Sequence, residues 1–300
     1  MAKSESNDKV RLNKYLATSG VASRRAVDRM IEEGQITVNG KKVYELGVKV
    51  DPDNDQISIN GKLLKKSTPM KLYILFNKPR GVLTTMEDPL ERPTVADYLI
   101  KVPGRVFPVG RLDWDSEGLL ILTNDGDFAN EVMHPSKEVT KTYLVKINKQ
   151  PADHLIEKLR RGVSIVGGRV AAKHIEKITK TGENKSEKYS WYKIVITEGK
   201  NRQIRQMFEK IGCDVLRLQR VAIGRLRLAS LKAGEFVYIN DAARERIFLA
   251  DNPNEVKQMK KIQGNNNLRS LKRVDSENKA GNSRKMLQYK KSASSKKSKT

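Results

Sequence analysis

The sequence has very little of the chemistry that disulfides and metal sites need. It contains one cysteine, Cys213, and three histidines in 300 residues. A single cysteine forms no internal disulfide and is typical of a protein from a reducing compartment. The histidines stand about twenty residues apart, without the close spacing of a ligand pair; they are His134, His154 and His174. We therefore predict neither a disulfide nor a metal site.

Further absences narrow the class of protein. The chain has no glycine-rich phosphate loop and no dinucleotide-binding fingerprint, so a nucleotide cofactor is not expected. It has no apolar run of about 18 residues that would cross a bilayer. Its first ten residues also lack the apolar segment of a signal peptide. These absences favour a cytoplasmic protein without cofactors, whose chemistry rests on carboxylates, arginines and tyrosines.

What the chain has in excess is positive charge. It contains 59 lysines and arginines against 35 acidic residues, a net charge of +24. Such an excess destabilises a compact chain by self-repulsion unless a polyanion binds it. The charge predicts a nucleic-acid partner, with an acidic membrane surface as the alternative. The basic end of the chain lacks the amphipathic apolar face that membrane binding requires, so no membrane association is expected.

Half of the excess charge lies in residues 257–300, where 14 basic residues face 2 acidic ones. This stretch is rich in Ser, Asn and Lys and carries too few apolar residues to bury a core. We predict a disordered polybasic tail over residues 251–300 that contacts RNA phosphates. The alternative is a solvated tail with no specific task.

Residues 8–66 have the pattern of a small αβ module. Leu12 and Leu16 are spaced as on a helix, and Ser23 is a suitable N-cap for a second helix that ends near Gly34. Asn-Gly pairs at 39–40 and 60–61 follow short alternating apolar stretches and predict two β-hairpins. The polar side of the helices collects basic residues and predicts an RNA-docking face; these residues are Arg11, Lys14, Arg24, Arg25 and Arg29. The alternative is an ordinary solvated helix face.

This module resembles the S-four-type RNA-binding domain. The resemblance is carried by residues 11–16 (RLNKYL), 23–25 (SRR) and 34–40 (GQITVNG). It implies binding to structured RNA and says nothing about chemistry.

The remainder of the chain has the pattern of one α+β domain. Ser67, Thr68 and Pro69 interrupt the pattern and predict a linker at 67–70. From 71 to 250, short alternating strands are separated by single helices. This order predicts a mixed, mainly antiparallel sheet flanked by helices. The expected helices cover residues 94–100, 127–133, 152–161 and 201–211; the expected strands include 72–76, 106–109, 119–122, 143–147, 189–197, 215–221 and 225–228.

The stretch 110–118 (GRLDWDSEG) carries the strongest sign of chemistry in this domain. It is a polar loop bracketed by glycines between two apolar strands, and four charged side chains fall within seven of its residues. Catalytic groups favour loops that a rigid sheet positions. The spacing alone favours the alternative, which is an ordinary acidic turn in which Arg111 neutralises Asp113 or Asp115.

Through this loop, the chain resembles the RsuA/RluB family of ribosomal RNA pseudouridine synthases. The loop matches the Gly-Arg-Leu-Asp hallmark of that family. Three more segments agree in order, namely 77–81 (NKPRG), 141–145 (KTYLV) and 198–207 (EGKNRQIRQM). The resemblance implies the pseudouridine synthase fold, an RNA substrate and no cofactor.

The resemblance also implies roles for individual residues. Asp113 is expected to be the catalytic carboxylate, and Tyr143 to lie against the target base and assist proton transfer. Arg205 is expected to form an ion pair with Asp113. Arg111 is the candidate to fill the space left by the displaced base. Arg202 lies roughly 160° around the helix from the apolar stripe, so we expect it to face solvent or an RNA phosphate.

These roles agree with the chemistry of the reaction. Pseudouridine forms when the N1–C1′ bond breaks, the uracil turns, and C5 joins C1′, so neither a redox cofactor nor an activated donor is needed. A carboxylate acts as nucleophile or base at a sugar whose glycosidic bond is breaking. Burial raises the pKa of a carboxyl group, so a shielded, ionised carboxylate needs a neighbouring cation, and the guanidinium fork suits this best. The target uridine must be flipped out of its stack.

The sequence favours one substrate class within the family. Residues 92–97 (RPTVAD) and 128–135 (FANEVMHP) look most similar to the RluB branch, which modifies 23S ribosomal RNA. A 16S ribosomal RNA synthase of the same family and a catalytically silent ribosome-assembly factor are the alternatives. The expected partner is 23S ribosomal RNA or an assembling ribosomal particle, and the expected state is a monomer.

Overall fold

The computed structural model describes residues 9–65, 69–178 and 188–249. The chain divides into two compact units. The first comprises residues up to 71 together with the short segments 103–105 and 124–126, and the second comprises the rest. Residues 67 and 68 of the expected linker and the whole expected tail at 251–300 lie outside the described residues.

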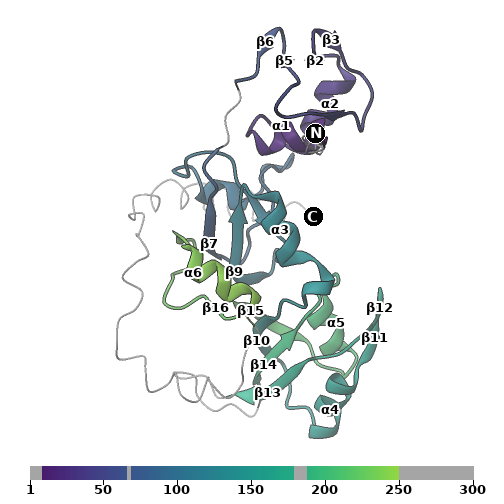
Figure 1. The fold of residues 1–300 in the computed structure, drawn as a ribbon. Helices are drawn as coiled ribbons and strands as arrows, with labels where there is room; N and C mark the ends of the chain where they lie inside the picture. The colour runs from purple at the N-terminus through teal and green to yellow at the C-terminus, as the bar shows by residue number, and fades with distance from the viewer. Residues whose placement is uncertain (1–8, 66–68, 179–187, 250–300) are drawn as a thin grey trace, which may run out of the picture. The chain divides into compact units, whose positions relative to one another are not determined.

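The first unit combines two short helices with small antiparallel sheets (Figure 1). The helices are α1 (Leu12–Thr18) and α2 (Arg24–Glu32). β1 (Val10–Arg11) pairs with β4 (Lys49–Val50). A second sheet has the order β3-β2-β5-β6, formed by β2 (Ile36–Val38), β3 (Lys41–Lys42), β5 (Ile57–Ile59) and β6 (Lys62–Leu63).

Local sequence signals account for these elements. The Ser23 hydroxyl accepts a hydrogen bond from the Ala26 N–H (3.1 Å), which caps α2. Gly34 follows the helix with φ +65°, a conformation that favours glycine. The helix start and end predicted from the sequence are therefore confirmed. The apolar faces of both helices and both sheets form one small core, made of Leu12, Leu16, Val27, Ile31, Ile36, Val50 and Ile57.

Both Asn-Gly pairs form the tight turns that the sequence predicts. Asn39 and Asn60 have φ of 51° and 48°, and the glycine after each also has positive φ. Two consecutive residues with positive φ match the twist of a two-residue β-hairpin. The turns connect β2 to β3 and β5 to β6.

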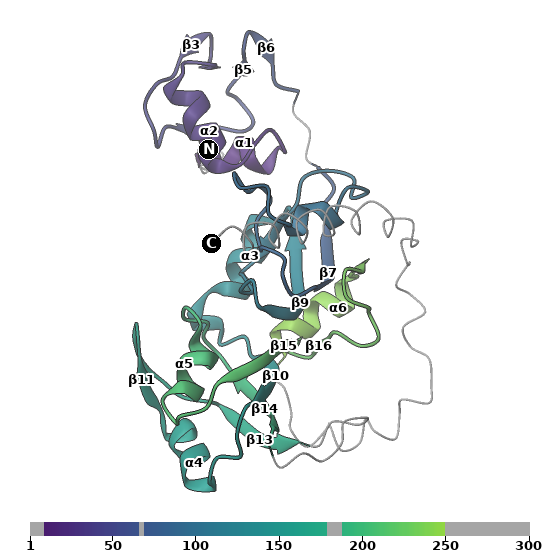
Figure 2. The ribbon, with the colours of Figure 1, turned by 180° about the vertical axis from the view of Figure 1, so that it is seen from behind.

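The second unit is built on a nine-stranded sheet with the order β13-β14-β10-β15-β9-β7-β17 (Figures 1 and 2). β16 pairs with β15, and β8 pairs with β9. Among the described strands, β9 and β15 run parallel and the other pairs are antiparallel, so the predicted α+β fold is confirmed. The strands are β7 (Tyr73–Lys78), β8 (Phe107–Val109), β9 (Ser116–Thr123), β10 (Lys141–Ile147), β13 (His174–Ile178), β14 (Ser190–Ile196), β15 (Val215–Ile223), β16 (Leu226–Arg227) and β17 (Phe236–Tyr238).

The centre of this sheet is buried on both faces. Leu120 and Leu122 of β9 belong to one hydrophobic cluster, whereas Leu119 and Ile121 belong to a second cluster on the opposite face. Side chains alternate between the faces of a strand, so a strand covered on both sides has a continuous apolar sequence. The run 119–122 is therefore a buried strand, as its sequence predicts.

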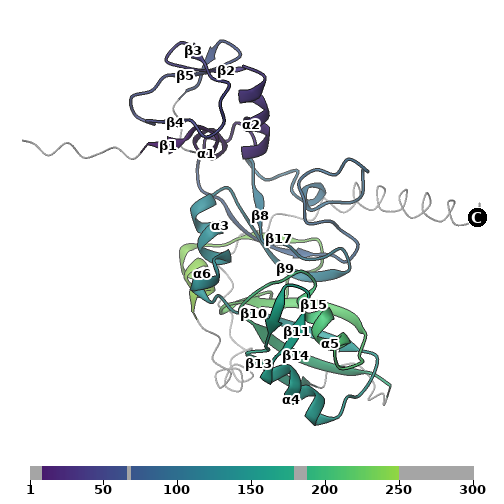
Figure 3. The ribbon, with the colours of Figure 1, turned by 90° about the vertical axis from the view of Figure 1, so that its right-hand side faces the viewer.

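Helices cover the two faces. α3 (Gly126–Met133) and the 3₁₀ helix η3 (Arg246–Phe248) contribute Phe128, Val132 and Ile247 to the second cluster. α4 (Asp153–Arg161) and α5 (Gln203–Glu209) contribute to the first cluster and lie beside β13 and the β11–β12 hairpin (Figure 3). None of the helices among the described residues is long and apolar enough to cross a membrane.

Several expected elements differ in detail. The helix expected at 94–100 is a 3₁₀ helix, η1 (Val95–Tyr98), in which Thr94 and Asp97 form a capping box. α3 starts at Gly126, so Asp127 lies in its first turn and is not its cap. The sequence did not predict β11 (Val163–Ile165), β12 (Gly168–Val170), β13 or β17, because strands of three to five residues carry little periodicity. The remaining short helices are η2 (Pro135–Lys137) and α6 (Asp241–Glu245).

Candidate active site

The acidic loop 110–115 joins β8 to β9 in the second unit, and hydrogen bonds fix its backbone from residue 112 onward. Every carbonyl from residue 112 to residue 116 accepts a hydrogen bond from a residue outside the loop. The donors are Thr84 Oγ1 to Leu112 (2.7 Å), Lys78 Nζ to Asp113 (3.2 Å) and Ser116 (2.8 Å), the Gly81 N–H to Trp114 (2.8 Å), and Arg205 Nη2 to Asp115 (3.2 Å). A loop held in this way presents its side chains in a preorganised geometry.

Lys78 lies at the centre of this scaffold. Its side chain is fully buried, and Nζ also donates to the Pro79 carbonyl (3.0 Å). Burial lowers the pKa of Lys78 to about 8, although the charges of Asp113, Asp115 and Glu117 oppose the shift. Three carbonyl acceptors match the three N–H donors of an ammonium group. Lys78 therefore joins the end of β7 to the acidic loop at Asp113 and to the first residue of β9.

Gly118, the second glycine of the motif 110–118, is required by the close approach of two strands. It has φ +106°, and a Cβ at this position would lie 2.2 Å from the Arg220 carbonyl oxygen. The parallel pairing of β9 with β15 places Gly118 directly beside Arg220. Only glycine allows the two backbones to approach so closely. The glycine thus permits the one parallel strand pair among the described strands. It also places Arg220 beside the start of β9, directly after the loop.

The environment of Asp113 differs from the one expected. Its side chain is 35% exposed, so it is half-buried and not shielded from water. The nearest cation is Arg202, whose Nη1 lies 3.9 Å from Asp113 Oδ2. Arg202 begins α5 in the left-handed conformation, with φ 48°, and its side chain is 47% exposed. Arg202 was expected to face solvent or phosphate; it is exposed, but it also lies within ion-pair distance of Asp113.

The expected ion pair between Arg205 and Asp113 was wrong. Arg205 Nη2 pairs with Asp115 Oδ1 at 3.1 Å, and its Nη1 donates to the Val215 carbonyl (2.9 Å). Burial lowers the pKa of Arg205, while Asp115 opposes the shift more strongly than Asp113 does. The two carboxylates are two residues apart in one loop, and the carbonyl of Asp115 already anchors the guanidinium. Spacing in the sequence does not distinguish them.

This geometry gives Asp115 a role that a turn residue would not have. Asp115→Asn should lower the free energy of unfolding by about 1 kcal/mol, because Arg205 keeps its carbonyl bonds but loses its charged partner. Activity should fall roughly tenfold as the loop loosens, far less than on loss of Asp113. Urea unfolding and a single-turnover rate would measure both effects. Equal activity losses for Asp113→Asn and Asp115→Asn would contradict this assignment.

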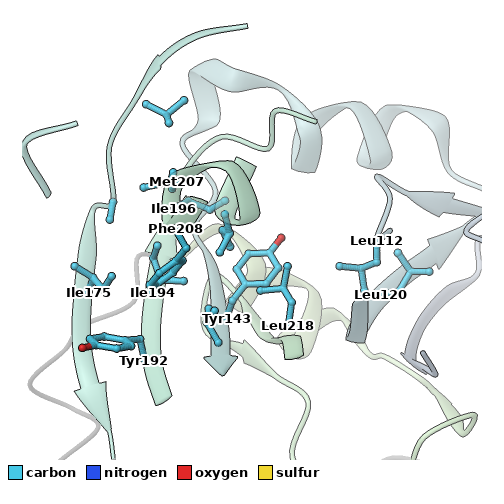
Figure 4. Packing of buried hydrophobic residues seen from close by; sticks show 14 of the residues in the cluster. Leu112, Leu120, Tyr143, Ile175, Tyr192, Ile194, Ile196, Met207, Phe208 and Leu218 are labelled. Atoms are coloured by element: carbon cyan, nitrogen blue, oxygen red, sulfur yellow. The ribbon is translucent and has the colours of Figure 1, made fainter. Parts of the chain in front are cut away.

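Tyr143 lies on β10 in the main hydrophobic cluster, between Phe208 and Met207 on one side and Leu112 and Leu120 on the other (Figure 4). It is only 7% exposed, so little of its ring is open for stacking in this structure. Its hydroxyl lies 3.5 Å from Arg220 Nη1.

The remaining predicted residues near the loop are exposed. Arg111 is exposed at the start of the loop, and Trp114 is 37% exposed directly after Asp113. The described residues contain no group of three or more His, Cys, Asp or Glu side chains arranged to hold a metal ion.

Sequence reasoning missed two buried cations. Lys78 belongs to the 77–81 motif, but a lysine between a strand and Pro79 gives no sign that it is buried. Arg220 occupies an alternating strand position, where a buried residue is usually apolar. Lys141 of the 141–145 motif is similar, since burial lowers its pKa to about 8 and Nζ donates to the Val139 and Thr197 carbonyls. The available sign of such a site was a lysine or arginine at a strand position where the alternating pattern predicts an apolar residue.

The basic residues predicted to dock RNA belong to α1, to α2 and to the residue before α1 in the first unit. Lys14, Arg24, Arg25 and Arg29 are all exposed on α1 and α2. Arg24 Nη2 lies 3.4 Å from Asn13 Oδ1, which connects the start of α2 to α1. We call this surface the α1–α2 basic face; its members are Arg11, Lys14, Arg24, Arg25 and Arg29.

Comparison with known proteins identifies the class. A family model described as RNA pseudouridylate synthase matches residues 72–210, which contain the acidic loop, Tyr143 and Arg205. The S4 domain model matches residues 10–57. A crystal structure titled pseudouridylate synthase superposes with a TM-score of 0.55 at 26% identity, covering 79% of this chain and 99% of that one. The fold is that of an RNA pseudouridine synthase.

Individual relatives narrow the class to a family. The chain is 41% identical to ribosomal large subunit pseudouridine synthase B of Bacillus subtilis over 252 residues, 84% of this chain and 96% of the relative. It is 38% identical to the dual-specificity RNA pseudouridine synthase RluF of Escherichia coli over 233 residues, 77% of this chain and 76% of the relative. The chain belongs to the RsuA/RluB family of ribosomal RNA pseudouridine synthases. The resemblance stated from the motifs is thereby confirmed.

Proposed function

We propose that this enzyme converts a specific uridine of 23S ribosomal RNA to pseudouridine, with Asp113 as its catalytic carboxylate. The observation that carries the proposal is the acidic loop, whose carbonyls from residue 112 to residue 115 are all anchored while the Asp113 carboxylate stays accessible. Residues 92–97 and 128–135 support the large-subunit substrate, as does the similarity to a relative named for the large subunit.

The residues divide the chemistry between them. Asp113 either attacks C1′ or removes the 2′ proton, and in both cases the N1–C1′ electron pair leaves with the uracil. Arg202 and Arg205 supply positive charge beside the loop, Arg202 within 3.9 Å of Asp113 Oδ2 and Arg205 through Asp115. Tyr143 lies at the base and assists proton transfer from C5 to N1. Arg111 fills the space that the flipped base leaves. The atoms balance without a cofactor.

RNA docking belongs to the first unit in this proposal. The α1–α2 basic face would contact phosphates of a folded RNA segment near the target, and residues 251–300 would add contacts that depend on charge alone. We propose domain limits of 8–66 for docking and 71–250 for catalysis. The enzyme would act as a monomer in the cytoplasm on ribosomal RNA or an assembling particle.

The substrate is tested by mapping. The enzyme would be incubated separately with 23S and 16S transcripts made without modification, and pseudouridines located by carbodiimide labelling and primer extension. One new site in 23S and none in 16S supports the proposal, and a site in 16S alone overturns the large-subunit assignment. If naked RNA gives no site, ribosomal assembly intermediates would be used. No site there either would favour a silent assembly factor.

The docking role makes a salt-dependent prediction. Arg25→Gln/Arg29→Gln should weaken RNA binding and reduce the slope of log affinity against log salt by about 0.7–0.9 per lost phosphate contact. Lys41→Gln/Lys42→Gln removes the same charge from exposed residues of β3 and serves as the matched control. Filter binding at several salt concentrations measures both slopes. Identical slopes for the two double variants would show that only net charge matters.

A further inference from the structure

Arg220 is a buried cation that the proposed function does not use. It lies on β15 and is only 4% exposed. Its Nε donates to the Leu119 carbonyl (2.7 Å), and its Nη1 lies 3.5 Å from Tyr143 Oη. Its Nη2 is buried and has no hydrogen-bond partner among the described residues. Buried arginines are normally paired with a carboxylate, and no ion pair of Arg220 occurs within the part of the chain that the structure describes.

The position of Arg220 joins the two catalytic strands. β15 lies between β10, which carries Tyr143, and β9, which begins after the acidic loop. Arg220 pairs with Tyr143 across one side and with Gly118 across the other. The sheet has a register shift between residues 142 and 143 at this point. Arg220 therefore lies directly across from Tyr143 on one side and from Gly118, which follows the acidic loop, on the other.

The contact with Tyr143 has a defined polarity. A guanidinium carries only donors, whereas a phenol both donates and accepts. The Tyr143 oxygen must therefore face Arg220 with a lone pair, and the positive charge repels the hydroxyl hydrogen. The hydrogen is directed away from Arg220, so the hydroxyl is oriented to donate it to a group on its other side. Catalytic hydrogen bonds are often long before substrate binds, which fits the 3.5 Å separation.

We infer that Arg220 is a positioning residue for catalysis, which holds the Tyr143 hydroxyl as a hydrogen-bond donor toward the departing uracil. The inference rests on the proposed function. When the N1–C1′ bond breaks, its electron pair passes to the uracil ring and is shared among N1, O2 and O4. At this step, before the proton transfer from C5 to N1, the Tyr143 hydroxyl donates a hydrogen bond to that negative charge. Arg220 strengthens the donor because its charge draws electron density from the phenol oxygen.

The charge of Arg220 acts on a lysine in each of the motifs 77–81 and 141–145. It contributes to the lowered pKa of Lys78 and of Lys141, in each case after burial, which is the larger cause. Arg220 thus adds positive charge close to both lysines, of which Lys78 is buried and Lys141 is partly buried, while Asp113, Asp115 and Glu117 counter the charge at Lys78. Such a cluster costs stability. It is suited to a reaction in which negative charge appears briefly on the substrate.

A purely structural role is the competing explanation, because Arg220 also ties β15 to β9 through the Leu119 carbonyl. A control for that role exists in the same unit. Arg160 Nη2 donates to the Ile175 carbonyl of β13 (2.6 Å) and makes no described contact with the site. Arg160→Gln removes an arginine-to-strand bond of the same kind and leaves Tyr143 untouched.

The test is a double-mutant cycle in the full-length enzyme on the RNA site mapped above. Single-turnover rate constants and RNA affinities would be measured for Arg220→Gln, Arg220→Lys, Tyr143→Phe and Tyr143→Phe/Arg220→Gln. Arg220→Gln should lower the rate constant about 100-fold and leave RNA affinity within about twofold. Arg220→Lys should recover part of the loss. In the Tyr143→Phe background, the same change should cost less than about threefold.

Two outcomes would overturn the inference. One is an equal loss from Arg220→Gln in both backgrounds, and the other is a similar loss from Arg160→Gln. Thermal melting of each variant identifies a loss caused by unfolding; if Arg220→Gln does not fold, the cycle is run with Arg220→Lys. Full activity of Asp113→Asn would instead refute the proposed function, so the two failures are distinguishable.

Discussion

Asp113→Asn is expected to abolish pseudouridine formation while the enzyme stays folded and binds RNA. Asparagine has the same shape as aspartate but neither attacks C1′ nor accepts the 2′ proton, so both possible routes are blocked. The loss should be at least about 1,000-fold in the single-turnover rate. The fold should be preserved because the Asp113 side chain is half-exposed and its backbone carbonyl, not its carboxylate, accepts from Lys78.

The measurement compares wild type and variant on unmodified 23S transcript, with carbodiimide mapping for product and filter binding for affinity. Asp115→Asn, which makes the same change two residues further along the loop, is the matched control. A variant that retains product formation would remove Asp113 from catalysis. A variant that loses RNA binding to the same extent would make the result a docking effect, because the carboxylate contributes no phosphate contact.

Lys78→Met is expected to have the second-largest effect. Methionine fills a similar volume but leaves the carbonyls of Pro79 and Ser116 buried without this donor, and each such acceptor costs about 1–3 kcal/mol. Removal of a buried charge offsets part of this cost, so the free energy of unfolding should fall by about 2 kcal/mol. Activity should fall about 100-fold, because a shift of about 1 Å in the loop is enough for such a loss.

Lys141→Met is the comparison for Lys78→Met. Lys141 is partly buried and also donates to two backbone carbonyls, but neither belongs to the acidic loop. Its replacement should reduce stability to a similar degree and activity to a smaller one. Equal activity losses at equal stability would show that Lys78 acts only through global folding.

The lowered pKa of Lys78 adds a pH signature to this prediction. The lysine titrates near pH 8 in the fold and near its ordinary value of 10.5 in the unfolded chain. Between these values the unfolded chain binds more protons, so this group makes the free energy of unfolding rise with pH. The penalty for burying the charge is fully present below pH 8. The stability difference between wild type and Lys78→Met should therefore widen from pH 8 to 10.5, as urea unfolding would show.

Local signals in the sequence predicted the first unit well. The Ser23 cap, the stop at Gly34 and the two Asn-Gly turns depend on residues within four positions of each other, and propensity alone decides them. The run 119–122 was equally clear, because burial on both faces leaves a continuous apolar strand. The family motifs then identified the loop that contains Asp113.

The charges of the site could not be predicted in the same way. The choice of Arg205 between Asp113 and Asp115 depends on where the loop carbonyls place the guanidinium, and that is a matter of a few ångströms between segments about 90 residues apart. The burial of Lys78 and Arg220 depends on strands that meet only in the folded sheet. Long-range pairing of this kind leaves no local pattern in the sequence.

The parallel pairing of β9 with β15 also sets an order of assembly. Arg220 and Leu119 are 101 residues apart in the chain. The strand that follows the loop with Asp113 therefore lacks its neighbour until β15 pairs with it. The core of the first unit, in contrast, is drawn from residues 12–57 alone. A chain folds as it leaves the ribosome, N-terminal parts first. The docking unit is therefore complete while the catalytic sheet still lacks its central strand, and a nascent enzyme acquires the means to hold RNA well before the means to modify it.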